Sequence, residues 1–165
     1  HLIGLYNANN INAAITIGCH FEVPVSDIKA AIESYVPENN RSQLLTKGTN
    51  EIILDAYNAN PSSMAVALEN FFQLENDNKI AILGDMLELG AVSEAEHSSI
   101  IETCNELSIP VLTVGIEFEG VNKVGHHYRD TSTLIASTVL SSFENYLILI
   151  KGSRGIGLEQ VAPLL

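Results

Sequence analysis

The sequence has little positive charge, no tryptophan and no long apolar run. Eight lysines and arginines stand against twenty aspartates and glutamates, which gives a formal net charge of −12 at pH 7. A surface of that sign repels nucleic acid and anionic lipid, so we expect neither as a partner. No apolar run approaches the roughly 20 residues that a membrane-spanning helix needs, and we expect no membrane association.

Cysteine is also scarce. Cys19 and Cys104 lie within apolar helical patterns, and the sequence has no CxxC motif. His126 and His127 have no further Cys or His residues at the spacing of metal ligands. We therefore expect two buried, reduced thiols in a cytoplasmic protein, without a disulfide or a metal site.

From residue 50 onward, apolar β-branched runs alternate with helical patterns. Strands are expected at 51–57, 79–84, 110–115 and 145–151, preceded by a short strand at 42–48. Helices are expected to begin near Pro61, at Ser93, where Glu96 completes the spacing of a capping box, and at Asp130 or Thr131. Continuously apolar strands are typical of sheets that are buried on both faces. The pattern predicts an α/β fold, with a doubly wound, mostly parallel sheet and helices on both faces.

Residues 1–36 have a different pattern, with two consecutive helical segments and no strand. The Pro/Asn-rich stretch 36–43 follows them and is typical of a hinge. We place a domain boundary here, so that 1–38 ends one domain and 39–165 forms another. Because the sequence opens almost at once on a motif and without an initiator methionine, we expect it to be part of a longer chain.

A glycine-rich turn follows the last predicted strand, in LILIKGSRGIGLEQVA (147–162). In isolation it is similar to the dinucleotide-binding turn of a dehydrogenase, but that fold places the turn after its first strand. We expect instead a turn that presents Lys151, Ser153 and Arg154 to an anionic group such as a carboxylate. The alternative is a glycine turn with solvated charges.

The segment IILDAYNANPSSM (52–64) is the most informative. Asp55 falls at a strand end, where a carboxylate can accept hydrogen bonds from ribose hydroxyls, and Asn58 and Asn60 precede a helix that starts with Pro61. A helix amino terminus attracts anions. The alternative is an Asx-rich loop in which Asn60 only caps the helix.

Three other segments also leave two interpretations open. Asp85 and Glu88 follow a predicted strand and suit a metal or a substrate amine, or they only cap and solvate the loop. His97, alone on a predicted helix, is expected to be structural. Asn7 and Asn10 lie three residues apart at a helix start, where their amides suit the edge of an adenine or cap the helix.

Five stretches together resemble the Mur ligases of peptidoglycan synthesis. They are GLYNANNINAAI, PENNRSQ, IILDAYNANPSSM, ILGDMLELG with a later serine and histidine, and IKGSRGIGLEQV. The resemblance implies a three-domain ATP-dependent ligase, of which this chain holds the end of the central ATPase domain and a whole Rossmann-like third domain. The sequence has no GxxxxGK[ST] loop, so the family's P-loop, Mg²⁺ ligands and modified lysine are expected in the missing part. The chain alone is then expected to be inactive.

The resemblance also implies site residues. Asn7 and Asn10 match the adenine contacts of the family, although Tyr6 stands where many members have histidine. Asp55 matches the acceptor for the ribose hydroxyls, and Arg41 matches an arginine that reaches the ATP phosphates from the domain junction.

Three further positions fall where a loop approaches those phosphates: Tyr57, Asn58 and Asn60. Arg41 and Asn58 are the residues expected to act in catalysis. Lys151, Ser153 and Arg154 would hold the carboxylate of D-Ala-D-Ala.

The implied reaction joins UDP-N-acetylmuramoyl-tripeptide to D-Ala-D-Ala. ATP phosphorylates the terminal carboxylate of the first substrate, the amine of the second attacks the acyl phosphate, and phosphate leaves from the tetrahedral intermediate. Positioning and charge neutralisation carry such a reaction. The alternatives are a sister ligase that adds another amino acid or forms polyglutamate, and a non-catalytic binding domain of the same fold.

Overall fold

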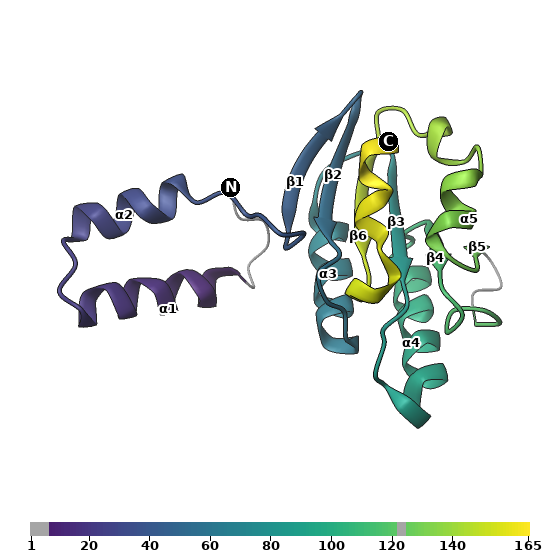
Figure 1. Ribbon diagram of the computed structural model, residues 1–165, viewed down its shortest axis with the longest axis horizontal. Helices are drawn as coiled ribbons and strands as arrows, with labels where there is room; N and C mark the ends of the chain where they lie inside the picture. Colours follow the sequence, from purple (N-terminus) through teal and green to yellow (C-terminus); the bar gives the residue numbers. More distant parts are fainter. Residues whose placement is uncertain (1–6, 122–124) are drawn as a thin grey trace.

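A six-stranded sheet forms the centre of the computed structural model, which describes residues 7–121 and 125–165 (Figure 1). The strands are β1 (Gln43–Lys47), β2 (Asn50–Asp55), β3 (Lys79–Gly84), β4 (Val111–Val114), β5 (His126–Tyr128) and β6 (Leu147–Lys151). Their spatial order is β1-β2-β6-β3-β4-β5, and only the β1–β2 pair among them is antiparallel. The predicted mostly parallel α/β sheet is confirmed.

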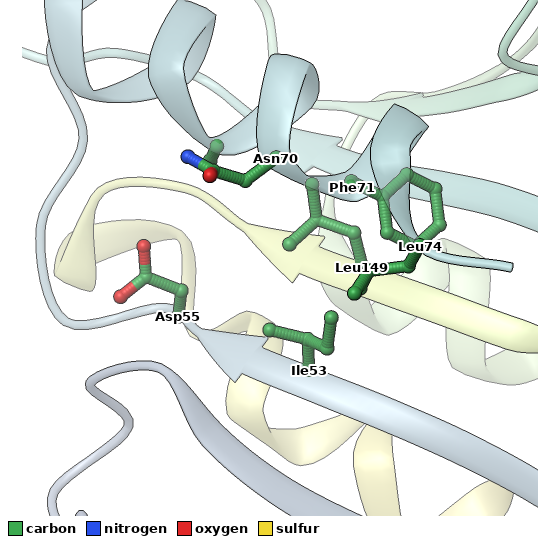
Figure 2. Close-up of a pocket in the computed structure, with 7 residues that line it drawn as sticks. Ile53, Asp55, Asn70, Phe71, Leu74 and Leu149 are labelled. Atoms are coloured by element: carbon green, nitrogen blue, oxygen red, sulfur yellow. The ribbon is translucent and has the colours of Figure 1, made fainter. Parts of the chain in front are cut away.

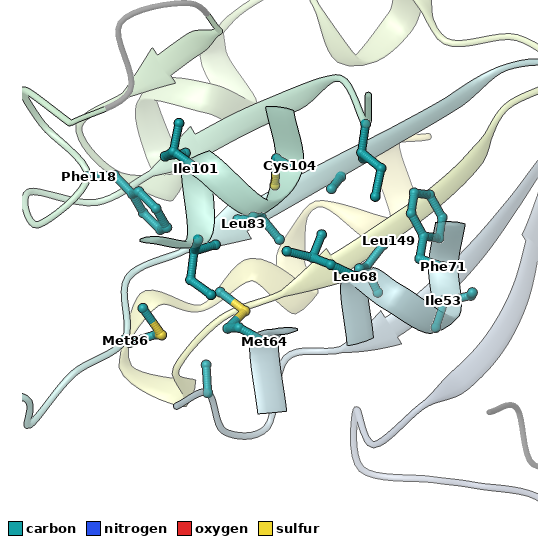
Figure 3. Close-up of a cluster of buried hydrophobic side chains, with 14 of the residues drawn as sticks. Ile53, Met64, Leu68, Phe71, Leu83, Met86, Ile101, Cys104, Phe118 and Leu149 are labelled. Carbon is teal, nitrogen blue, oxygen red and sulfur yellow. The ribbon is translucent and has the colours of Figure 1, made fainter. Parts of the chain in front are cut away.

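Helices and turns cover both faces of this sheet. On one face α3 (Pro61–Gln73) and α4 (Ser93–Glu106) bury a cluster that includes Met64, Leu68, Phe71 and Cys104 (Figure 3). On the other face lie α5 (Thr131–Ala136) and the 3-10 turns Leu140–Ser142, Arg154–Ile156, Leu158–Gln160 and Ala162–Leu164.

The central strand β6 shows why its sequence is continuously apolar. Leu147 and Leu149 point into the first cluster, and Ile148 and Ile150 point into the second. Because successive side chains of a strand point to opposite faces, a strand covered on both faces needs apolar residues at every position.

Two elements differ from the sequence expectation. The helical pattern of residues 130–143 forms an α-helix only from Thr131 to Ala136, behind the cap Asp130, and β5 was not predicted. The hydroxyls of Ser137 and Ser142 donate to the carbonyls of Leu134 and Val139, which offers the backbone an alternative to a continuous helix. β5 has only three residues and is partly exposed, so it carries too little apolar pattern to be recognised.

The two cysteines have different environments. Cys104 is buried as expected, and burial raises the pKa of its thiol to about 12. Cys19 is exposed, so the expectation of a second buried thiol was wrong. Ile17 on the same helix and Phe21, which follows the helix directly, are exposed too, because the apolar residues of this segment do not face the core of the sheet.

The first two helices, α1 (Asn7–His20) and α2 (Val25–Ser34), form a hairpin that extends away from the sheet (Figure 1). They approach closely at Gly18, where a Cβ would come within 2.8 Å of the Cδ1 atom of Ile28. Among the described residues no helix is long and apolar enough to span a membrane. The division of the chain near residue 38 stays a prediction.

A buried asparagine joins three segments at the edge of the sheet where β2 and β6 begin. The Nδ2 atom of Asn50 donates to the carbonyls of Phe143 (2.8 Å) and Leu165 (2.7 Å), and its Oδ1 atom accepts from the N–H of Tyr146 (3.0 Å). Asn50 therefore satisfies three backbone groups of the carboxy-terminal half.

We expect Asn50→Ala to lower the free energy of unfolding by about 1–3 kcal/mol, because it leaves buried backbone groups without partners. Urea denaturation of the chain measures this loss. The same substitution at Asn105, which is exposed on α4, should change stability by less than about 0.5 kcal/mol. Equal losses in the two variants would contradict the role assigned to Asn50.

Candidate functional site

A cleft of about 790 Å³ lies between the α1/α2 hairpin and the carboxyl ends of β2 and β6. Its volume is within the range of roughly 300–1,000 Å³ that is usual for small-molecule sites. Eight of the ten predicted site residues line it: Asn7, Asn10, Arg41, Asp55, Tyr57, Asn58, Asn60 and Lys151. The structure therefore brings together residues that the sequence spreads over four segments.

An ion pair between Asp55 and Lys151 lies at the base of the cleft. β2 and β6 are parallel neighbours, and Asp55 and Lys151 are register partners at their carboxyl ends. The buried Nζ atom of Lys151 lies 2.5 Å from Oδ2 of Asp55 and 3.4 Å from the carbonyl of Asn58. The Oδ1 atom of Asp55 accepts from the N–H of Ser42 at 3.1 Å. Asp55 therefore ties β6 to the turn that enters the sheet domain.

That turn carries Arg41 and has an unusual backbone. Asn39, Asn40 and Ser42 have positive φ angles of 60°, 58° and 49°, and asparagine tolerates this conformation better than most residues. The carbonyl of Asn40 also accepts from the N–H of Tyr57 at 3.2 Å. The contribution of Ser42 was not predicted, and the Asn-Asn pair was the available signal for such a turn.

Two arginines approach one aromatic ring at the cleft. The Cζ atom of Arg41 lies 3.9 Å from the centroid of the Tyr57 ring, and that of Arg154 lies 5.4 Å from it. Cations are attracted to the face of such a ring. The ring of Tyr57 thus holds near each other two guanidinium groups that are far apart in the sequence.

The opposite wall of the cleft belongs to α1. The Nδ2 atom of Asn10 donates to Oδ1 of Asn7 at 3.4 Å, with Asn7 buried and Asn10 exposed. The two asparagines therefore act as one polar unit that faces the sheet across the cleft. Tyr6, which precedes them, lies outside the described residues.

The loop between β2 and α3 has its own hydrogen bonds. Asn60 caps α3 by accepting from the N–H of Ser63 at 2.8 Å, which completes a capping box, and a role of Asn60 toward a ligand stays a prediction. The Oδ1 atom of Asn58 accepts from the N–H of Ala59 at 3.0 Å. Since Pro61 has no N–H and the N–H of Ser63 is bonded to Asn60, the first turn of α3 offers an anion fewer donors than a helix start without proline.

Two of the predicted residues, Ser153 and Arg154, are not in the lining of the cleft. Ser153 is buried: its N–H donates to the carbonyl of Asp85 (3.0 Å), and its Oγ atom accepts from the N–H of Leu87 (2.9 Å). Arg154 is exposed and reaches the site through Tyr57.

Asp85 and Glu88 do not form a carboxylate pair. Asp85 is buried and accepts from the N–H groups of Glu117 (3.0 Å) and Phe118 (3.1 Å), whereas Glu88 is exposed. Burial raises the pKa of the Asp85 carboxyl, and the two N–H donors oppose that rise in part. Within 7–121 and 125–165, no group of three or more His, Cys, Asp or Glu residues could hold a metal ion.

His97 is buried on α4, next to Asp85. Its Nε2 atom accepts from the N–H of Met86 at 3.0 Å, so its proton is on Nδ1, which donates to the carbonyl of Ser93 at 2.8 Å. The predicted capping box at Ser93 was wrong, because Ser93 lies within the helix and its hydroxyl donates instead to Glu117.

A second, apolar crevice of about 20 Å³ lies beside Asp55, between α3 and the strands β2 and β6 (Figure 2). It has room for roughly one water molecule. Figure 2 shows the carboxylate of Asp55 pointing away from the apolar side chains of Ile53, Phe71 and Leu149. The crevice is therefore too small for a ligand larger than water, and most of the predicted polar site residues line the larger cleft instead.

An open parallel sheet with a polar cleft at its strand ends is the usual ligand-binding arrangement of α/β enzymes. The family model described as Mur ligase, glutamate ligase domain, matches residues 40–154. This chain belongs to the Mur ligase family and contains that domain.

The similar proteins are named as MurF or as UDP-N-acetylmuramoyl-tripeptide–D-alanyl-D-alanine ligases. The chain is 33% identical over 175 aligned residues to the UDP-N-acetylmuramoyl-tripeptide–D-alanyl-D-alanine ligase of Treponema pallidum, covering 99% of this chain and 38% of that protein. A crystal structure of MurF from Acinetobacter baumannii matches with a TM-score of 0.83 and 26% identity, covering 98% of this chain and 38% of that one.

A third match is the MurF ligase of Thermotoga maritima in complex with ADP, with a TM-score of 0.77 and 25% identity. It covers 94% of this chain and 36% of that one. The chain therefore spans little more than a third of the length of the proteins that it resembles.

The fit between Asp85 and Gly115 is tight enough to test. A Cβ at Gly115 would lie 2.2 Å from the Cγ atom of Asp85. The φ angle of Gly115 is 125°, which other residues rarely adopt. We expect Gly115→Ala to cost about 2–5 kcal/mol of stability, from backbone strain and the clash together. Gly120 has a positive φ of 91° but nothing within 4 Å of its Cβ position, so Gly120→Ala measures strain alone. Denaturation curves that coincide for the two variants would contradict the clash.

Proposed function

We propose that this chain is the carboxy-terminal part of an ATP-dependent ligase that adds D-Ala-D-Ala to UDP-N-acetylmuramoyl-tripeptide. One observation carries the proposal: Asn7, Asn10, Arg41 and Asp55 meet in one cleft although they come from separate segments. The names of the similar proteins supply the two substrates, and a bound ADP in one of them supports a nucleotide site.

The residues of the cleft suit the three parts of a nucleotide. The amides of Asn7 and Asn10 have the donors and acceptors that an adenine edge needs. The carboxylate oxygens of Asp55 each accept one bond already, and an ionised carboxylate has about four acceptor positions. They therefore retain capacity for ribose hydroxyls.

Arg41 would bind the phosphates. Its guanidinium is exposed to the cleft and stacked against Tyr57, which restricts its orientation before any ligand arrives. Charge that develops on a phosphoryl group is stabilised best by such a preoriented donor. Tyr57, Asn58 and Asn60 would then shape the loop beneath the phosphates. Mg²⁺ and its ligands are expected in the part of the ligase outside this chain.

The acceptor substrate would bind beside Arg154. Lys151 is buried and paired with Asp55, so its charge is already neutralised, whereas Arg154 is exposed. Arg154 would therefore be the main partner of the D-Ala-D-Ala carboxylate, and Lys151 would hold the end of β6. Ser153 would support the turn between them.

The proposed function is tested by phosphate release from ATP with the full-length ligase and UDP-N-acetylmuramoyl-tripeptide. We expect release only when D-Ala-D-Ala is also present, because the acyl phosphate is consumed by its amine. Release with another amine and not with D-Ala-D-Ala would indicate a sister ligase. Absence of release with every amine would favour a binding domain.

Arg41 offers a test of the site itself. We expect Arg41→Ala to reduce kcat/KM by about 100-fold or more, since it removes a charge that stabilises the transition state. The free energy of unfolding should change by less than about 0.5 kcal/mol, because the side chain is exposed. Lys47→Ala, which removes an exposed cation on β1, is the control and should leave both quantities unchanged. A large stability loss in Arg41→Ala would assign Arg41 to the scaffold.

A further inference from the structure

The turn 152–157, which we name the acceptor turn, rests on the loop 85–88, which we name the support loop. Two hydrogen bonds join them: the N–H of Ser153 donates to the carbonyl of Asp85 (3.0 Å), and the N–H of Leu87 donates to Oγ of Ser153 (2.9 Å). The backbones also touch, since a Cβ at Gly152 would come within 2.9 Å of the Cα atom of Gly84. The position of the acceptor turn thus depends on that of the support loop.

The support loop is held in turn by His97. The N–H of Met86 donates to Nε2 of His97 at 3.0 Å, and the ring packs edge-on against Phe118 with centroids 4.5 Å apart. The other nitrogen is bonded to the carbonyl of Ser93, which fixes the rotation of the ring. His97 is fully buried, so it cannot contact a substrate in the cleft.

The bonded groups are consecutive along the backbone. The carbonyl of Asp85 and the N–H of Leu87 hold Ser153, and the N–H of Met86 between them is bonded to His97. A shift of Met86 would therefore move both anchors of Ser153. Arg154 follows Ser153 directly, and small displacements of a group that positions substrate are costly in rate.

We propose that His97 is a positioning residue for the acceptor substrate, acting through the support loop on the acceptor turn. This rests on the proposed function, because it takes Arg154 as the partner of the D-Ala-D-Ala carboxylate. The residues assigned to ATP lie on α1, the turn 39–42, β2 and the loop 56–60 that follows β2, and His97 makes no described hydrogen bond to any of them. Its loss should therefore affect one substrate and spare the other.

The test uses the full-length ligase with His97→Leu, which keeps the volume and removes the acceptor for the N–H of Met86. We expect the KM for D-Ala-D-Ala to rise at least about tenfold, with the KM for ATP changed less than about twofold. His97→Gln can place an oxygen near the position of Nε2 and should restore most of the loss, whereas the shorter His97→Asn should not. If His97→Leu fails to fold, the comparison of Gln with Asn carries the test.

Asn50→Ala is the matched control, because it breaks a buried hydrogen-bond network at the opposite edge of the sheet. We expect it to lower stability without raising the KM for D-Ala-D-Ala. An equal rise in that variant, or an equal rise of both KM values in His97→Leu, would show that His97 only stabilises the domain.

Hydrogen exchange separates this proposal from the proposed function. In His97→Leu the amides of the acceptor turn should exchange faster, while those of residues 55–60 should not, whatever amine the enzyme uses. Unchanged exchange in the acceptor turn would overturn the role of His97 even in an active ligase. If exchange is faster in an enzyme that does not use D-Ala-D-Ala, His97 is still a positioning residue, but the proposed acceptor substrate is wrong. The KM comparison would then be made with the amine that the enzyme accepts.

Discussion

The site depends on the insertion of β6 between β2 and β3. This pairing makes the last strand of the chain the central one, and its register sets Lys151 beside both Asp55 and Leu83. A buried lysine without a partner would be strongly unfavourable, so the ion pair with Asp55 also constrains where β6 can end. The same pairing brings the acceptor turn over the end of β3, where Gly84 and Gly152 allow the two backbones to meet.

Several of the few positive charges lie together at the carboxyl ends of β2 and β6. The chain has eight lysines and arginines, and three of them, Arg41, Lys151 and Arg154, meet around Tyr57 and Asp55. Elsewhere acidic residues dominate. Since Lys151 is paired with Asp55, the exposed cations of this group are Arg41 and Arg154, and they make this edge of the sheet more favourable for an anion than an acidic surface is.

Two supports hold the strand ends from different sides. The turn 39–42 contacts β2 and the loop behind it through Ser42 and Asn40, and it carries Arg41 into the cleft. The support loop contacts the acceptor turn from the side of α4 and is fixed by His97. The α1/α2 hairpin adds Asn7 and Asn10 from outside the sheet. One wall of the cleft is therefore the hairpin, and the other is formed by the ends of β2 and β6.

The sequence by itself determined the elements and the polar residues at their ends. The sequence predicted five of the six described strands within one or two residues, and Asn60 with Pro61 predicted the start of α3, because these signals act between close neighbours in the chain. Tertiary structure alone decided that β6 lies between β2 and β3, that Ser93 bonds to Glu117 rather than capping α4, and that Cys19 is exposed. These outcomes arise from contacts between residues far apart in the sequence, whose partners no local pattern specifies.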